Sequence, residues 1–173
     1  MKDEILSAAI EVVALHGLNN WTVEEVANRA HCAKGLVNYH YRSKNELLAL
    51  AAETIRDDRC ARRLAAVQVR GTAALDRLWQ TLVKEVDSGW FAAWLSLLSA
   101  DDPLRRKAAS QPQESRRFAS ALGRALSLGN ELTKKADLIQ AGLDGLQLQL
   151  LSGLPPEKVE QEFHEFWLTV VTQ

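Results

Sequence analysis

Apolar side chains recur at helical spacing along nearly the whole chain, and no segment alternates in the way a half-buried strand does. Gly17 ends the first predicted helix, because glycine tolerates the left-handed conformation that closes many helices. Thr22 and Glu25 then form a capping-box pattern that opens a second, short helix. The stripe of the first helix consists of Ile5, Ala9, Val12, Val13 and His16.

A third and a fourth helix follow closely. Residues 31–33 form a tight connection to a short helix over residues 34–40. Ser43 and Glu46 repeat the capping-box pattern and open a longer helix that continues past Cys60 to about Val67.

Beyond Arg70 the predicted helices are longer and end at glycine, proline or paired acids. Five segments are expected, of which the third is broken or kinked near Pro112 and the last begins near Pro156. The pattern therefore predicts an all-α protein of about nine helices. Its expected domains are a three-helix head, residues 1–46, and a helical body, residues 47–173, which includes the long fourth helix.

Composition narrows the class of protein only a little. The chain has 173 residues, 47% of them hydrophobic, and a formal net charge of -1, so its overall charge does not indicate nucleic acid. No segment is long and apolar enough to cross a bilayer, and Met1–Ile10 does not resemble a signal peptide. Cys32 and Cys60 lie far apart, so we expect inert thiols, with a redox sensor as the less favoured alternative. A cytoplasmic location is the expectation.

Charge is distributed unevenly along the N-terminal part of the chain. Residues 1–28 contain one basic residue and five acids, whereas residues 29–44 contain four basic residues and no acid. A carboxylate facing a duplex would be repelled by phosphates, and Lys and Arg supply most non-specific DNA affinity. The alternative, a solvated loop between core helices, does not account for the two capping boxes on either side.

Two short helices joined by a tight turn and braced by a preceding helix form a helix-turn-helix, whose second helix enters the major groove. Asn38 can donate to and accept from a base edge, and Lys44 lies at a helix N-terminus where anions are favoured. Leu36, Val37 and Tyr41 are expected to face inward. The predicted DNA-binding residues are Thr22, Ala33, Lys34, Gly35, Asn38, Tyr39, His40 and Lys44.

The run TVEEVANRAHCAKGLVNYHYRSKNELL, preceded by ILSAAIEVVALHGLNNW, resembles the N-terminal domain of TetR-type transcriptional regulators over roughly residues 3–50. The resemblance implies an all-helical homodimer that binds a palindromic operator and is released from it by a small ligand. Three positions depart from the family pattern. His31 stands at the usual turn glycine and must tolerate a left-handed or strained conformation. Asn38 and Tyr41 replace the usual aromatic and Phe.

The body weakly resembles the BetI-type branch in the stretches LDGLQLQLLSG and WFAAWLSLLSADDPLRRK. The best-known members of that branch answer to choline, and aromatic faces suit a quaternary ammonium ion. Core packing is the favoured alternative for the tryptophans, and Asp144 could instead cap a kink or pair with Arg or Lys. The predicted ligand-binding residues are Trp79, Trp90, Trp94, Phe118 and Asp144.

The last two predicted helices carry small and apolar residues that favour a two-fold four-helix bundle between subunits. Close helix approach would use the small residues, with large apolar side chains around them. The predicted dimer-interface residues are Ala141, Gly142, Gly145, Leu148, Phe163 and Trp167.

Together these features predict a ligand-responsive repressor that binds a palindromic double-stranded DNA operator. An activator is not distinguished from a repressor by the sequence, and the effector is not identified. The rival function is a helical ligand-binding or scaffold protein without DNA activity. No catalytic residues, metal ligands, cofactor or membrane partner are expected, because no nucleophile–base pair, phosphate loop or metal-ligand cluster occurs.

Overall fold

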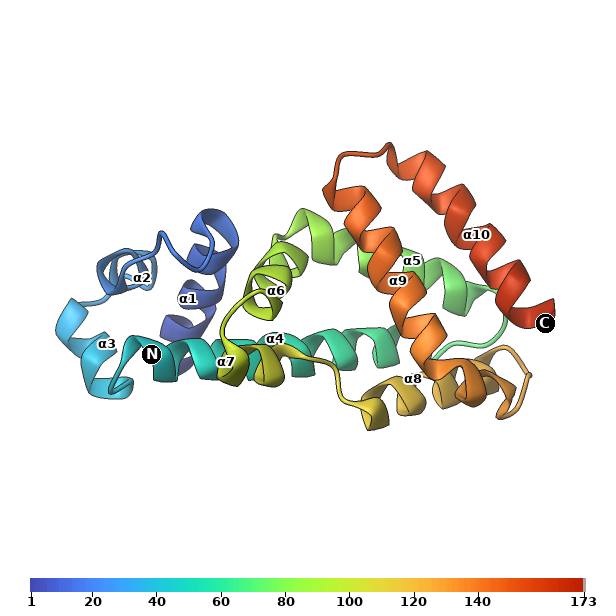
Figure 1. Ribbon diagram of the computed structural model, residues 1–173, viewed down its shortest axis with the longest axis horizontal. Helices are drawn as coiled ribbons and strands as arrows, with labels where there is room; N and C mark the ends of the chain where they lie inside the picture. Colours follow the sequence, from blue (N-terminus) through green and yellow to red (C-terminus); the bar gives the residue numbers. More distant parts are fainter. Residues whose placement is uncertain (173) are drawn as a thin grey trace. The chain divides into compact units, whose positions relative to one another are not determined.

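The computed structural model describes residues 1–172 and contains ten α-helices, one short 3-10 helix and no strand among those residues. The predicted all-α class is confirmed (Figure 1). The predicted break near Pro112 separates two helices, α7 (Asp102–Ala108) and α8 (Pro112–Ala125), and this adds one helix to the expected nine. Pro112 occupies the first turn of α8, where its missing N–H costs no hydrogen bond.

The chain divides into two compact units. Unit 1 comprises Met1–Asp58 and Ser88–Ala109, and unit 2 comprises Arg59–Asp87 and the chain from Ser110 onward. The long helix α4 (Lys44–Ala66) contributes its first part to unit 1 and its last part to unit 2. The boundary expected after residue 46 separates the two predicted functions, DNA binding and ligand binding, and not the compact units. It stays a prediction.

Unit 1 is built around α1 (Lys2–His16), against which α2 (Val23–Arg29), α3 (Lys34–His40) and α6 (Trp90–Leu98) pack. The apolar members of the predicted stripe are buried, whereas His16 is exposed, and Gly17 ends α1 at the predicted position with φ 71°. Helix α7 packs on α6, where the indole N–H of Trp94 donates to the Ala108 carbonyl at 3.0 Å. Two segments distant in sequence, α1–α3 and α6–α7, thus share one core.

Unit 2 contains α5 (Ala73–Asp87), α8, the 3-10 helix η1 (Glu131–Lys135), α9 (Ala136–Leu151) and α10 (Pro156–Thr172). Helices α9 and α10 lie side by side (Figure 1), and α9 also packs on α5 and α8. Gly123 of α8 touches the turn that precedes η1, because a Cβ at this position would lie 2.2 Å from the Gly129 carbonyl oxygen. The α8–η1 contact therefore requires the absence of a side chain there.

Candidate nucleic-acid interface

Helix α2 begins at the predicted capping box. The Glu25 backbone N–H donates to the Thr22 hydroxyl at 3.2 Å, and the Glu25 carboxylate accepts from the Thr22 backbone N–H at 2.7 Å. The backbone N–H and the hydroxyl of Thr22 both donate to the Glu25 carboxylate, and these two bonds lower the pKa of Glu25 below its ordinary value. The turn after α2 passes through His31 at φ 51°, so the predicted left-handed conformation at the position of the missing glycine is confirmed.

Helix α3 presents a polar face to solvent and an apolar face to the core. Tyr39 is 80% exposed, its ring meets His40 edge-on at 5.2 Å, and Asn38 is also exposed. On the other face, Val37 and Tyr41 are buried as predicted, and the Tyr41 hydroxyl donates to the Lys2 carbonyl at 2.8 Å. The exposed amide and phenol therefore stand where base edges and phosphates would be reached.

Two basic residues near α3 lie close to acidic residues of other helices. Arg29 pairs with Glu11 of α1 at 2.5 Å, and the Lys34 ammonium lies 3.8 Å from Glu24. Acids and bases that are separated in sequence thus meet in space, which weakens the predicted polarisation of this region.

Lys44 has an internal role that periodicity did not predict. Its ammonium donates to the Trp21 carbonyl at 2.7 Å and lies 4.2 Å from the centre of the buried Trp21 ring. This cation–π contact braces the loop before α2 against the start of α4. A phosphate contact by Lys44 stays a prediction and would compete with this bond.

Arg42 is a candidate that the predicted site omitted. Its side chain is exposed, and within the part of the chain that the structure describes its guanidinium makes no hydrogen bond or ion pair. Its backbone N–H donates to Glu46 at 2.9 Å, which fixes the position of the residue between α3 and α4. The charge count over residues 29–44 included Arg42 and could have identified it.

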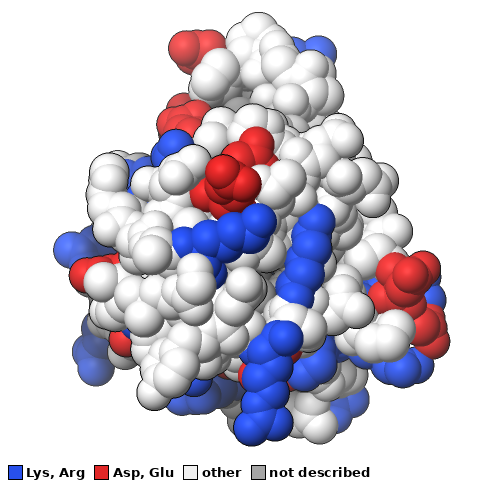
Figure 2. Space-filling view, turned by 90° about the vertical axis from the view of Figure 1, so that its left-hand side faces the viewer, with Lys and Arg blue, Asp and Glu red and all other residues white. Residues whose placement is uncertain are grey.

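Figure 2 shows the side of the molecule to which α2 and α3 belong. Lys and Arg side chains run down the middle of this face, whereas Asp and Glu lie above and beside them. Such a basic strip, with exposed hydrogen-bonding groups on α3, is the electrostatic pattern of a surface that contacts a duplex backbone.

The predicted ligand-binding residues fall in different units. Trp90 and Trp94 belong to unit 1, whereas Trp79 and Phe118 are buried in the core of unit 2. Trp79 packs against Phe163 with ring centres 5.4 Å apart. This packing matches the core-filling alternative, and a ligand-binding role for these residues stays a prediction.

Asp144 takes part in a buried charge network that we call the arginine network: Arg59 and Arg63 of α4, Glu85 of α5, and Asp144 and Gln147 of α9. Both guanidinium groups donate to the same Asp144 carboxylate oxygen at 2.9 Å. Both also donate to the Gln147 amide oxygen, at 3.1 and 2.8 Å. This is the pairing with arginine that the sequence left open for Asp144.

The arginine network shifts the pKa values of Asp144 and Arg59. Burial acts to raise the pKa of Asp144, but the neighbouring guanidinium groups of Arg63 and Arg59 offset it, and the pKa lies below its ordinary value. Burial and the positive charge of Arg63 lower the pKa of Arg59, against the opposing pull of Asp144 and Glu85. The cluster thus contains two positive and two negative groups, and it fastens α4 to α5 and α9.

The predicted dimer residues divide into exposed and buried sets. Ala141, Gly145 and Leu148 are exposed on one face of α9. Phe163 and Trp167 instead face the core of unit 2, where they are almost fully buried. Gly142 packs within the subunit as well, because a Cβ there would lie 2.4 Å from the Phe166 ring. Exposed large apolar side chains on these two helices include Leu138 on α9 and Leu168 on α10.

The described part of unit 2 includes an open groove between α4 and α5 and another beside α10, and the predicted ligand-binding residues line neither of these. One lies between α4 and α5, with a volume of about 540 Å³, and carries Arg62, Arg77 and Lys84. The other, of about 370 Å³, is apolar and is lined by Leu75, Leu128, Trp167 and their neighbours. Among residues 1–172 no three metal-binding side chains come together, and no helix has the length and hydropathy needed to cross a membrane.

Comparisons with known proteins also find a helix-turn-helix family in the N-terminal part of the chain. Residues 5–51 match the family described as bacterial regulatory proteins, tetR family. No curated protein matches the chain.

Several solved structures share the fold. A transcriptional regulator from Rhodococcus sp. Rha1 is 29% identical, with a TM-score of 0.71, and the match covers 94% of this chain and 91% of that one. A transcriptional regulator (TerR/AcrR family) from Aquifex aeolicus VF5 is 19% identical, with a TM-score of 0.69 and 98% of both chains covered. The multidrug binding protein EbrR complexed with malachite green is 22% identical, with a TM-score of 0.69, over 98% of this chain and 96% of that one.

The matched residues 5–51 are those that form α1, the helix-turn-helix and the first turns of α4. The resemblance read from the sequence and the folded geometry therefore lead to one assignment. Residues 5–51 thus form an N-terminal domain of the tetR family of bacterial regulatory proteins.

Proposed function

We propose that the protein is a ligand-responsive transcriptional repressor that binds a palindromic operator as a homodimer and is released by a small-molecule effector. The observation that carries the proposal is the exposed polar face of α3, with Asn38 and Tyr39 unengaged by other elements, behind a capped α2. In a helix-turn-helix this second helix reads the major groove. The rival function, a scaffold without DNA activity, gives no reason for such a face.

Selection of bound duplexes from a random pool tests the proposal most directly. A repeated, inverted half-site is the expected result, because a two-fold dimer presents two copies of α3. Recovery of no enriched sequence, with no salt-dependent binding to any duplex, would favour the scaffold function.

Alanine at Lys34 or at Arg42 is expected to weaken binding to every duplex and to lower the slope of log affinity against log salt by about 1 for each variant. Both side chains are exposed, and the guanidinium of Arg42 has no partner among the described residues. Fluorescence anisotropy titrations at several salt concentrations measure both quantities. Lys158→Ala, which removes an exposed charge from α10, is the control and is expected to leave the slope unchanged. Unchanged slopes for both variants would refute this DNA-contacting face.

The homodimer is proposed to form through α9 and α10 of unit 2. Leu138, Ala141, Gly145 and Leu148 recur at spacings of three and four and form an exposed stripe on α9. Leu168 and Val171 expose apolar surface on α10. Exposed apolar stripes on adjacent helices are the surfaces that two-fold helical bundles bury.

Leu148→Glu is expected to weaken dimerisation by about 100-fold, since each of two symmetric interface copies would bury a charge at a cost of about 1.4 kcal/mol or more. Sedimentation velocity over a range of concentrations measures the dissociation constant. Leu15→Glu, at an exposed leucine of α1 in unit 1, is the matched control and is expected to leave the dimer intact. A dimer that tolerates Leu148→Glu but not Leu15→Glu would place the interface elsewhere.

The effector is proposed to act through α4, the helix shared by both units. In unit 2, α4 is held by α9 through Asp144 and Gln147, and α9 also carries the proposed dimer face. An effector shifts the equilibrium only by its differential affinity for the DNA-binding and released states. Contacts that reposition α4 in unit 2 are therefore the proposed route of release.

A further inference from the structure

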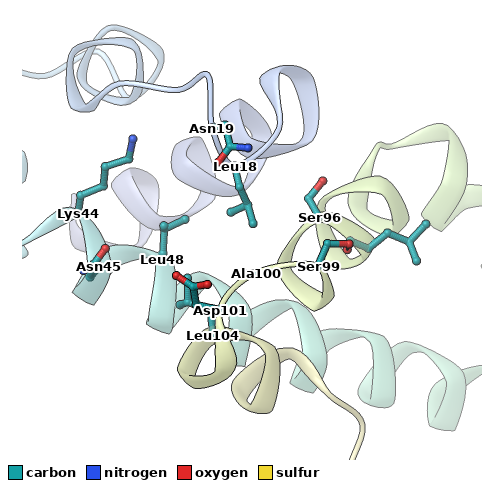
Figure 3. A pocket seen from close by; sticks show the side chains of 11 residues that line it. Leu18, Asn19, Lys44, Asn45, Leu48, Ser96, Ser99, Ala100, Asp101 and Leu104 are labelled. Atoms are coloured by element: carbon teal, nitrogen blue, oxygen red, sulfur yellow. The ribbon is translucent and has the colours of Figure 1, made fainter.

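Unit 1 contains an open cleft that the proposed function does not use. Its volume is about 640 Å³, within the range of small-molecule sites. Figure 3 shows that its walls come from the α1–α2 connection, the start of α4 and the α6–α7 segment. Apolar surface in the cleft is supplied by Leu18, Leu48, Leu95 and Leu104.

The wall formed by α6 and α7 presents hydrogen-bond acceptors. The hydroxyls of Ser96 and Ser99 donate to the carbonyls of Ala92 and Leu95, both at 3.0 Å, so only their lone pairs remain for a ligand. Asp101 precedes α7, but its carboxylate caps no backbone N–H and has no partner among the described residues. This wall therefore offers one negative charge and two neutral acceptors.

Within residues 1–172 no lysine or arginine forms an ion pair with Asp101. Lys44 is the basic residue among the described lining residues, and its ammonium is bound to the Trp21 carbonyl and stacked on the Trp21 ring. Figure 3 shows the Lys44 chain rising along one edge of the cleft, away from Asp101. The next arginines on α7, Arg105 and Arg106, pair with Asp102.

We infer that this cleft binds a small primary ammonium compound with a short apolar body. The ammonium group would donate to the Asp101 carboxylate, which accepts the charge-assisted hydrogen bonds that such a group makes. The apolar body would cover Leu48 and Leu104. The amides of Asn19 and Asn45, which make no side-chain hydrogen bond within residues 1–172, would meet any polar substituent.

The probe for the test is 2-phenylethylammonium chloride, titrated into the full ¹⁵N-labelled chain at low ionic strength and followed by NMR. The expected result is saturable shifts of the Asn19 and Asn45 side-chain amides, with a dissociation constant of about 1 mM, ordinary for a ligand of this size. 2-Phenylethanol, which lacks the charge, and benzyltrimethylammonium, which lacks N–H donors, are each expected to bind at least about tenfold more weakly. Binding by either compound as tight as that of the probe would overturn the inference, as would the absence of saturable shifts.

Asp101→Asn removes the charge while keeping a residue suited to precede a helix, and it is expected to weaken binding of the probe about tenfold or more. Asp101→Ser is a second variant with the same expectation. Asp3→Asn, an equal charge change at an exposed position of α1 outside the cleft, is the matched control and is expected to bind the probe like the parent. Parental affinity in both Asp101 variants would refute the site. DNA binding is measured separately, so either proposal can fail while the other stands.

Discussion

Replacing Asp144 with alanine is expected to lower the free energy of unfolding by about 3 kcal/mol, the lower end of the range for breaking a buried ion pair. The substitution leaves Arg59 and Arg63 buried, each only 4% exposed, with one carboxylate fewer between them. The loss is not larger because the Asp144 side chain is 22% exposed and Gln147 still accepts from both guanidinium groups.

Chemical denaturation followed by far-UV circular dichroism measures this loss. Glu165→Ala removes an exposed acid from α10 and is the matched control, expected to stay within about 0.5 kcal/mol of the parent. A loss at Asp144 no greater than that of the control would mean that the arginine network does not hold unit 2 together.

The contribution of Asp144 is also expected to depend on pH. Its folded-state pKa lies below the ordinary value of 3.8, so the stabilisation is fully present above that value. It is lost as the pH falls further, through the folded-state pKa, because the carboxyl then protonates in both states. The stability difference between the parent and Asp144→Asn should thus be constant from pH 5 to 8 and shrink below about pH 4. A difference that instead grows on acidification would contradict the lowered pKa.

Gly123→Ala is expected to destabilise unit 2 by about 3 kcal/mol, the upper part of the usual range for overpacking. The added Cβ would lie 2.2 Å from the Gly129 carbonyl oxygen, which is backbone and cannot rotate away. Relief requires the turn at residues 127–130 to move, and this turn is tied to α8 by the Leu128 N–H, which donates to the Gly123 carbonyl at 2.8 Å.

Thermal and chemical unfolding measure this effect. The matched control is Gly35→Ala, a helical glycine whose added Cβ would meet nothing within 4 Å. Since alanine is the better helix former, the control is expected to be neutral or stabilised by up to about 1 kcal/mol. A Gly123→Ala protein as stable as the parent would show that the turn before η1 moves at little cost.

Local features were predictable from sequence because their causes are local. The capping box at Thr22 and Glu25 and the left-handed turn at His31 involve neighbours in the chain, and both are present in the structure. The exposure of Asn38 and the burial of Val37 follow from the helical period alone.

Long-range partners were not predictable in the same way. The polarity of Asp144 on an apolar helix signalled that it needs a partner, but helical spacing gives no means to find Arg59, which lies 85 residues earlier. The inclusion of α6 and α7 in unit 1 likewise depends on the contact of α6 with α1 and of α7 with α6, which the helical spacing of apolar residues does not reveal. Phe163 and Trp167 were assigned to a partner surface because an apolar stripe does not state which neighbour covers it.

The single ammonium group of Lys44 would serve two roles, one in the fold and one in DNA binding. Its ammonium braces Trp21 in the free protein, and the proposed operator contact would draw on the same group. Evolution therefore cannot adjust operator affinity at this residue without also disturbing the fold around it. Drift in DNA preference should accumulate instead at Asn38, Tyr39 and Arg42, whose exposed side chains make no hydrogen bond or ion pair with another helix within residues 1–172.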